Sequence, residues 1–260
     1  MTSVILMVIC GVSCMRVNAG TIETCKVFYV PFKVSERQAY QTFQKRCTGS
    51  YGEYRSTRVA GHRHAGVDLR GSAGEQVFAV GAGRVARLLP AAYRAVRPIA
   101  RVRVWARSPE QAEALAAQWR AQGFDAQRAD DLGAAVSEAD IVSCATLATE
   151  PLLQGRWLRP GSHLDLIGSF TPAMREADDA CWAGAAIYVD TEEALSKSGD
   201  LLGPLARGVI TPASVRGTLT SLARGEAPGR LSPSERSVFK SVGTALEDLA
   251  AAMLVMEPAR

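Results

Sequence analysis

One stretch, residues 77–108, constrains the fold of this 260-residue chain more than any other. It opens with a short apolar run that ends at Gly81 and Gly83, and a helix-forming segment follows. A second apolar run, residues 102–106, closes on Arg107. The order strand, glycine turn, helix, strand is typical of the first βαβ unit of an α/β fold.

The small residues of this turn have a chemical reason if the unit binds a dinucleotide. Gly81 lets the chain leave the strand with a φ that other residues avoid, Gly83 lets backbone N–H groups approach a pyrophosphate, and Ala86 keeps the helix close to the sheet. The second strand ends in Arg107 and Ser108, where NAD sites usually carry an acidic residue for the ribose hydroxyls. A cation and a hydroxyl suit a 2′-phosphate, so the pattern favours NADP(H). A tight structural turn without a nucleotide is the alternative.

Strands and helices keep alternating after this unit. Ser108 is expected to cap a helix that starts at Pro109 and ends at Gly123, whereas Pro90 should kink the preceding helix at a cost of about 3 kcal/mol. Further strands are expected at 125–128, 141–146, 163–169 and 185–190, and further helices at 130–139, 211–224 and 234–255. The sequence thus predicts an α/β fold with a Rossmann-type, doubly wound and mostly parallel sheet over residues 76–260.

The composition excludes several classes of function. The net charge of +4 is spread along the chain, which gives no basic patch for nucleic acid. The six cysteines form no CxxC pair, so neither a zinc ribbon nor a redox pair is indicated. A hydrophobic fraction of 47% is ordinary for a globular protein, and we expect a cytoplasmic one.

The first 19 residues suggest a second possibility for the location. The apolar run at 4–15, followed by small residues up to Ala19, has the form of a signal peptide and its cleavage site. No Lys or Arg lies near its start, so a buried strand or helix is the alternative. The run is shorter than the roughly 20 residues that span a bilayer, and no membrane span is predicted. Export would place the four cysteines before residue 50 in an oxidising compartment, where they could pair.

Residues 20–75 are expected to form a small, irregular, β-rich segment. His64 and Asp68 lie in it with three residues between them, and a strand pattern with Gly and Val follows. This pattern, over residues 54–85, resembles the first metal-ligand box of the lysostaphin-type zinc endopeptidases that cut peptidoglycan cross-bridges. That family takes a third ligand and a catalytic base from a downstream His-x-His, but here only His163 follows His64. A retained strand and turn without metal is therefore favoured, with a zinc peptidase as the alternative.

Six motifs downstream match one family in order. They are Gly81–Ala86, Val102–Ser108, Ser143–Leu152, Leu158–Pro172, Ser198–Asp200 and Phe239–Asp248. From Gly81 to about Leu254 the chain resembles the nucleotide-binding half of the ornithine cyclodeaminase/mu-crystallin family. It is most similar to the branch that reduces Δ1-pyrroline-2-carboxylate and Δ1-piperideine-2-carboxylate.

The resemblance implies an NADP(H)-dependent reductase of a small cyclic imino acid, which adds hydride to a C=N bond next to a carboxylate. The protein would orient the nicotinamide carbon against the imine carbon and hold the carboxylate with cations. No catalytic residue is assigned. Carried over by position, the family's cofactor contacts fall on Gly81, Gly83, Arg84 and Val85 (pyrophosphate), Arg107 and Ser108 (2′-phosphate), Cys144, Ala145, Thr146 and Leu147 (along the cofactor), and Ile167, Gly168 and Ser241 (near the nicotinamide).

The sequence departs from the family's pattern in two places, and these departures bear on which function the chain has. Cyclodeaminases place an Asp in the loop where this chain has Gly168-Ser169-Phe170, so imine reduction is favoured over cyclisation of ornithine. The family's substrate-binding arginine and lysine lie in a longer N-terminal half, whereas 80 residues precede Gly81 here. The chain therefore reads like a fusion of two partial genes with a seam near Val80, and a non-catalytic NADP(H)-binding module is the alternative to a reductase. Because the family pairs through its first domain, formation of a homodimer is left open.

Overall fold

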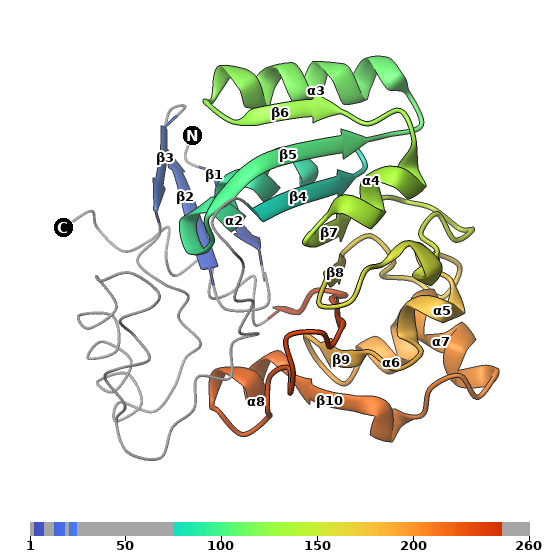
Figure 1. Cartoon of the computed structure of the whole chain (residues 1–260). Coiled ribbons are helices and arrows are strands. Elements are labelled where there is room, and N and C mark those ends of the chain that lie inside the picture. Colours follow the sequence, from blue (N-terminus) through green and yellow to red (C-terminus); the bar gives the residue numbers. More distant parts are fainter. Residues whose placement is uncertain (1–2, 8–12, 19–20, 25–74, 246–260) are drawn as a thin grey trace, which may run out of the picture.

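The computed structural model describes residues 3–7, 13–18, 21–24 and 75–245 (Figure 1). Within these ranges the main body is built on one parallel eight-stranded sheet, with the strand order β10-β9-β11-β8-β7-β4-β5-β6. Its strands are β4 (Glu75–Val80), β5 (Ile99–Trp105), β6 (Asp125–Arg128), β7 (Ile141–Cys144), β8 (His163–Leu166), β9 (Ala186–Val189), β10 (Val215–Thr218) and β11 (Ser237–Lys240).

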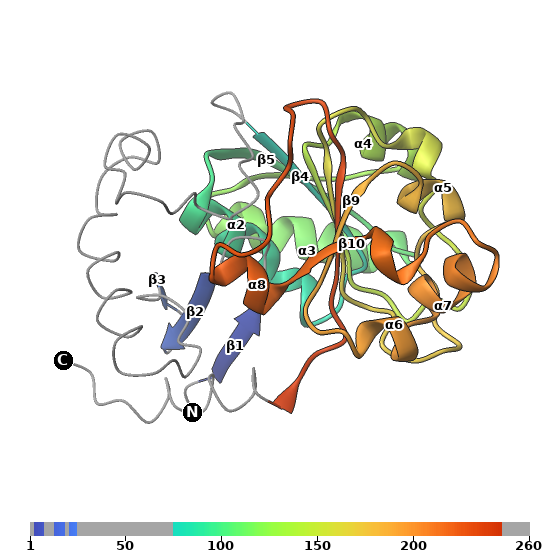
Figure 2. The same cartoon turned by 90° about the horizontal axis from the view of Figure 1, so that it is seen from below.

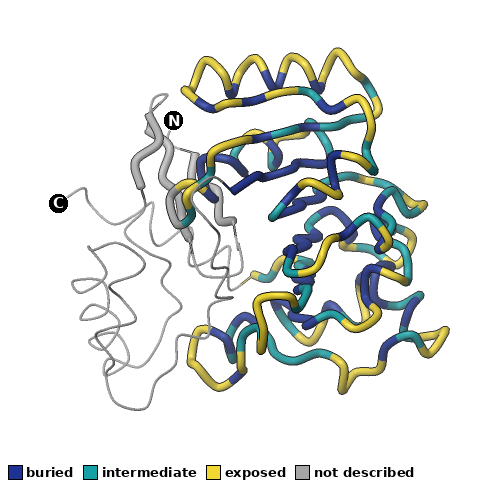
Figure 3. Tube along the Cα trace, viewed as in Figure 1, coloured by how far each residue is buried: buried dark blue, intermediate teal, exposed yellow. Residues whose placement is uncertain are grey.

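Helices cover both faces of this sheet (Figure 2). They are α2 (Leu89–Val96), α3 (Pro109–Ala121), α4 (Leu132–Glu138), α5 (Asp179–Trp182), α6 (Ala194–Lys197), α7 (Gly199–Ala206) and α8 (Leu219–Ala223), with 3-10 turns η2 (Ala86–Leu88), η3 (Gly155–Trp157) and η4 (Pro212–Ser214). Val77 and Ala79 pack in one core with α2, α3 and α8, whereas Phe78 and Val80 pack in a second core with α4, α5, α6 and α7. Successive side chains of a strand point to opposite faces, so β4 is buried on both sides (Figure 3). The predicted doubly wound Rossmann-type fold is confirmed.

The order of the crossovers places the candidate site. From β4 the chain runs outward to β5 and β6, and it then returns to β7 on the other side of β4. The connections that leave β4 and β7 therefore diverge at the C-terminal ends of these strands. In open α/β sheets, ligands bind in the crevice at such a switch point. Gly81 follows β4 directly and lies there.

Local capping signals in the sequence predict α3 and α4 correctly. The Ser108 hydroxyl accepts a hydrogen bond from the Gln111 N–H at 3.2 Å, and α3 begins at the next residue. Gly123 has a φ of +81° and ends this segment. The Asp131 carboxylate accepts a hydrogen bond from the Ala134 N–H at 2.8 Å and caps α4.

The predicted kink at Pro90 is wrong. The chain after the glycine turn first forms η2, and α2 begins only at Leu89. Pro90 therefore occupies the first turn of α2, where a backbone N–H would have no partner within the helix. The missing donor of proline costs nothing at this position, and its fixed φ suits the start of a helix.

The sequence also predicts two helices near the C-terminus, at 211–224 and 234–255, and the structure shows other elements in these segments. The segment 211–224 forms η4, β10 and only then the short helix α8. The segment 234–255 contains β11, which lies between β8 and β9. All four residues of β11 are buried, because strands flank it on both sides and helices cover both faces of the sheet. The four-residue spacing of Val238 and Val242 fits a helical face equally well, and this misled the prediction.

The N-terminal strands β1 (Ser3–Met7), β2 (Ser13–Asn18) and β3 (Thr21–Thr24) form an antiparallel sheet. The peptidase-like box with His64 and Asp68 lies outside the described residues, as do residues 246–255 of the predicted last helix. In the part of the chain that the structure describes, no helix has the length and apolar character needed to cross a membrane. In the same part, His, Cys, Asp and Glu side chains do not gather into a group that could hold a metal ion.

Candidate dinucleotide-binding site

Gly81 begins the turn after β4 and has no room for a side chain. Its φ is +108°, which L-residues rarely adopt. A Cβ at this position would lie 2.7 Å from the carbonyl oxygen of Ala145, in the loop after β7. The Gly81 N–H donates to the Trp105 carbonyl oxygen at 2.8 Å, which ties the turn to the end of β5. The turn is therefore fixed between the two strands that neighbour β4.

Gly83 is different, because it lies in the open. It is exposed, and a Cβ added to it would meet no heavy atom within 4 Å. Arg84 beside it is exposed, Val85 is half-buried against the core, and Ala86 is fully buried. The burial of Ala86 agrees with a close approach of η2 to the sheet, while the backbone at Gly83 is free to meet a ligand.

The corner after β5 carries two exposed groups of opposite charge. Arg107 is exposed, and no hydrogen bond or ion pair to another described residue engages its guanidinium. The Ser108 hydroxyl donates to the Glu110 carboxylate at 2.6 Å while it caps α3. This hydrogen bond lowers the pKa of Glu110 below its ordinary value, and the carboxylate is ionised at neutral pH. Sequence reasoning missed Glu110, although an acidic residue in the first turn of a helix is common.

The loop after β7 becomes accessible one residue beyond the strand. Cys144 is fully buried, and burial raises the pKa of its thiol well above the ordinary value, which makes the thiol unreactive. Ala145 and Thr146 are half-buried, and Leu147 is 70% exposed. The surface that this loop offers to a ligand therefore begins at Ala145.

The loops after β8 and β11 meet the same edge of the sheet. The Ile167 N–H donates to the Cys144 carbonyl oxygen at 2.8 Å, and the Ser241 N–H donates to the Leu166 carbonyl oxygen at 3.1 Å. Ile167 and Ser241 are half-buried, whereas Gly168 is buried. The structure thus brings together the residues predicted to lie along the nicotinamide half of the cofactor.

A carboxylate fixes the loop that contains Ser241. One Asp190 oxygen accepts hydrogen bonds from the Val242 N–H at 2.6 Å and the Gly243 N–H at 2.7 Å. The other accepts from the Thr191 N–H at 2.7 Å. Asp190 is 2% exposed and follows β9, so it anchors the backbone beyond β11 from the neighbouring strand.

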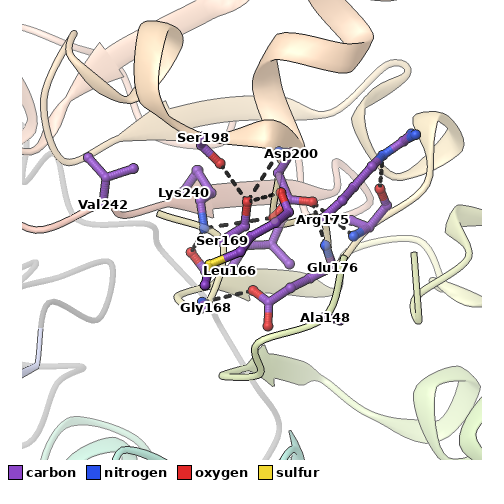
Figure 4. A network of polar contacts seen from close by, with 12 residues as sticks. Ala148, Leu166, Gly168, Ser169, Arg175, Glu176, Ser198, Asp200, Lys240 and Val242 are labelled. Atoms are coloured by element: carbon purple, nitrogen blue, oxygen red, sulfur yellow. Dashed lines mark hydrogen bonds and ion pairs between the residues drawn. The ribbon is translucent and has the colours of Figure 1, made fainter. Parts of the chain in front are cut away.

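Behind the loops lies a buried ionic network, Glu176, Asp200 and Lys240, that the sequence analysis did not assign (Figure 4). All three side chains are fully buried. The Lys240 ammonium donates to the Leu166 carbonyl oxygen at 3.0 Å and lies 3.8 Å from an Asp200 oxygen. Burial lowers the pKa of Lys240, and the two carboxylates oppose that shift. Asp200 and Lys240 fall within the quoted motifs, but only the tertiary structure places them side by side.

Another buried carboxylate, that of Asp165, supports the sheet next to this network. One of its oxygens accepts hydrogen bonds from the Tyr93 hydroxyl at 3.0 Å and the Ser143 hydroxyl at 2.8 Å. Burial raises the pKa of Asp165 to about 6, against the effect of these hydrogen bonds. Asp165 thereby joins β8 to β7 and to α2 underneath the candidate site.

Comparison with known proteins agrees with this geometry. The sequence profile of the ornithine cyclodeaminase/mu-crystallin family matches residues 69–260. The Δ1-pyrroline-2-carboxylate reductase of Paracoccus denitrificans is 51% identical over 177 residues, which cover 65% of this chain and 54% of that protein. The ketimine reductase mu-crystallin of Mus musculus is 38% identical over 157 residues, covering 60% and 46%. The chain thus spans about half the length of these curated relatives.

Solved structures show the same relationship. The Δ1-pyrroline-2-carboxylate reductase of Thermococcus litoralis, in complex with NADH and L-proline, superposes with a TM-score of 0.68 at 31% identity, over 70% of this chain and 57% of that one. The iminosuccinate reductase of Paracoccus denitrificans, in complex with NAD+, gives 0.66 at 27% identity, over 71% and 56%. By its profile match and its fold, the chain belongs to the ornithine cyclodeaminase/mu-crystallin family.

Proposed function

We propose that this chain binds a nicotinamide dinucleotide and reduces a cyclic ketimine of the Δ1-pyrroline-2-carboxylate or Δ1-piperideine-2-carboxylate type. The observation that carries the proposal is the turn after β4, where Gly81 is locked in place and Gly83 opens onto free space at the switch point of the sheet. Relatives named as Δ1-pyrroline-2-carboxylate and ketimine reductases support the imine substrate. When bound, the cofactor supplies the hydride.

The chain's own residues hold and orient the cofactor in this proposal. Backbone N–H groups from Ala82 to Val85, with the Arg84 guanidinium, bind the pyrophosphate, and Gly81 shapes the turn that presents them. Ala145, Thr146 and Leu147 line the cofactor, and Ile167, Gly168 and Ser241 form the surface at the nicotinamide. We assign no described residue to the carboxylate of the imine.

NADP(H) is the proposed cofactor, and Arg107 is the reason. Its guanidinium is exposed and unengaged among the described residues, so it can bind a 2′-phosphate at little cost. Glu110 works against this preference, because an ionised carboxylate beside Ser108 repels a phosphate and suits a ribose hydroxyl. The solved relatives hold NADH or NAD+, so relative affinity is the quantity to measure.

Imine reduction is favoured over cyclodeamination by the loop after β8. Ser169 and Phe170 stand where cyclodeaminases carry their aspartate. Ser169 is buried, and its hydroxyl donates to the Met174 carbonyl oxygen at 2.6 Å, so it does not replace a carboxylate as a base. A simple reduction needs no such base in this loop, since the imine already contains the bond that accepts hydride.

Fluorescence titration with NADPH and NADH, followed by an assay of cofactor oxidation with each imine, tests the proposal. Saturable binding with turnover supports it. Tight binding without turnover on either imine would instead support a non-catalytic binding module, which the chain's half-length match to its relatives makes the second candidate. Absence of binding to both cofactors would refute both functions. Cytoplasmic location and homodimer formation stay predictions.

A further inference from the structure

Glu176 joins the two loops that follow β7 and β8. Its side chain is fully buried, in the segment between β8 and α5. One carboxylate oxygen accepts hydrogen bonds from the N–H and the hydroxyl of Thr146, both at 2.7 Å. The other accepts from the Gly168 N–H at 2.8 Å (Figure 4). A single side chain thus fixes one residue in each loop.

The two loops are in direct contact at this point. A Cβ on Gly168 would collide with the carbonyl oxygen of Thr146 and with the Glu176 carboxylate. Both loops reach solvent shortly after this contact, since Leu147 is 70% exposed and Phe170, which follows the buried Ser169, is 47% exposed. Glu176 therefore acts where the loops leave the rigid sheet, just before they reach the surface of the candidate site.

The position of Glu176 is itself determined by the rest of the network. Its N–H and that of Ala177 donate to one Asp200 oxygen at 2.8 and 3.0 Å. The second Asp200 oxygen accepts no hydrogen bond from another described residue and faces the Lys240 ammonium at 3.8 Å. Lys240 in turn holds the last carbonyl of β8. Contacts therefore connect the ends of β8 and β11, through Lys240 and Asp200, to Glu176, whose carboxylate holds the two loops.

The two oxygens of Glu176 are both needed for this arrangement. Each of them faces a backbone N–H donor, so an amide in this place would turn its own NH2 group toward one of these N–H groups. Burial raises the pKa of Glu176, and the nearby Lys240 ammonium opposes that rise. Burying a carboxylate is costly, and packing alone would be served by a neutral side chain.

We propose that Glu176 is a positioning residue for the nicotinamide half of the bound dinucleotide. It sets the relative placement of Thr146 and Gly168, and through them the surface on which the nicotinamide ring rests. Among the described residues, no hydrogen bond or ion pair joins Glu176 to the pyrophosphate turn at Gly81 to Val85 or to Arg107, so these groups hold the adenosine half of the cofactor without it. This inference rests on the dinucleotide site proposed above.

The test compares two ligands on three proteins. NADPH contains the nicotinamide, whereas 2′-phospho-ADP-ribose lacks it and retains every group of the other half. Both are titrated against the wild-type chain, Glu176→Gln and the control Asp178→Ala. The control removes a carboxylate that accepts hydrogen bonds from Gly155 at 2.8 Å and Cys181 at 3.2 Å, away from both loops. Thermal unfolding of each free protein reports the general loss of stability.

We expect Glu176→Gln to weaken NADPH binding about tenfold, the usual effect of a broken hydrogen bond to a charged group. It should leave 2′-phospho-ADP-ribose binding unchanged, and Asp178→Ala should bind both ligands like the wild type. Equal weakening of both ligands, or none, would overturn the inference while leaving the proposed function intact. Failure of the wild type to bind either ligand would overturn the proposed function itself.

A second variant covers the case in which Glu176→Gln does not fold. Thr146→Val keeps the shape of its side chain and removes one of the three hydrogen bonds. A loss of about threefold in NADPH affinity, with no change for 2′-phospho-ADP-ribose, is expected. Unchanged NADPH affinity in this variant counts against Glu176 as a positioning residue.

Discussion

The two glycines after β4 should respond in opposite ways to substitution by alanine. Gly81 has a φ of +108° and would bring a new methyl group to 2.7 Å from the Ala145 carbonyl oxygen. Gly83 has an ordinary φ and free space around it. The first substitution therefore strains the folded chain, whereas the second fits the folded chain and causes a collision only when a ligand approaches the backbone.

The magnitudes follow from these environments. At Gly81 the strained backbone costs about 1–3 kcal/mol and the collision another 1–3 kcal/mol or so, which gives a loss of about 2–6 kcal/mol in the free energy of unfolding. At Gly83 the alanine should raise that free energy by about 0.4–1 kcal/mol, because it restricts the unfolded chain. If its methyl group displaces the pyrophosphate from one backbone N–H, the loss of about 1.5–3 kcal/mol in binding corresponds to about 10- to 150-fold weaker affinity.

Urea unfolding and NADPH titration on both variants separate the two effects. Gly83→Ala should unfold at the same or a higher urea concentration than the wild type and bind NADPH more weakly. Gly81→Ala should unfold at a lower urea concentration than the wild type. The reasoning is refuted if Gly83→Ala destabilises the chain as much as Gly81→Ala does, or if it binds NADPH as tightly as the wild type.

Three further predictions concern charge. Arg107→Ser should weaken NADPH binding about tenfold with little effect on NADH binding. Glu110→Gln should strengthen NADPH binding. Titrations of each variant with NADPH and NADH check both expectations, and an equal change in affinity for the two cofactors would contradict them. Burial lowers the pKa of His163 to about 3 from 6.5, so its contribution to stability is complete above pH 6.5 and is lost as the pH falls toward 3. Urea unfolding between pH 7 and 4 should therefore show a slope of about 1.4 kcal/mol per pH unit that His163→Gln removes. Lys240→Met leaves the charge of the buried Asp200 without its partner and should lower the free energy of unfolding by about 3–5 kcal/mol. A second change, Asp200→Asn, should restore part of that loss. Additive losses in the double variant would argue against an interaction between the two side chains.

Local signals in the sequence were sufficient for the first half of the fold. A strand that ends in glycine, a capping serine before a proline, and a glycine at the end of α3 each specify backbone geometry within a few residues. The parallel order of the strands then follows from their alternation with helices. These are the features that the structure confirms between β4 and β8.

The same reasoning failed where burial overrides periodicity. Ser237 and Lys240 are polar residues in β11, yet both are fully buried, and the apolar residues around them repeat at a helical spacing. Such a segment forms a strand here because the sheet has room for one between β8 and β9, and no local sequence pattern predicts that room. The position of Pro90 likewise depends on how many residues the turn uses before α2 begins.

By itself, the sequence determined that the chain turns at two glycines between a strand and a helix and presents an arginine after the next strand, because a few neighbouring residues encode these features. The tertiary structure alone decided that Glu176, Asp200 and Lys240 meet behind the loops and that the Cys144 thiol is buried instead of exposed to a ligand. These residues lie in separate segments of the chain, and only the closing of the sheet brings them together and removes water from their charges.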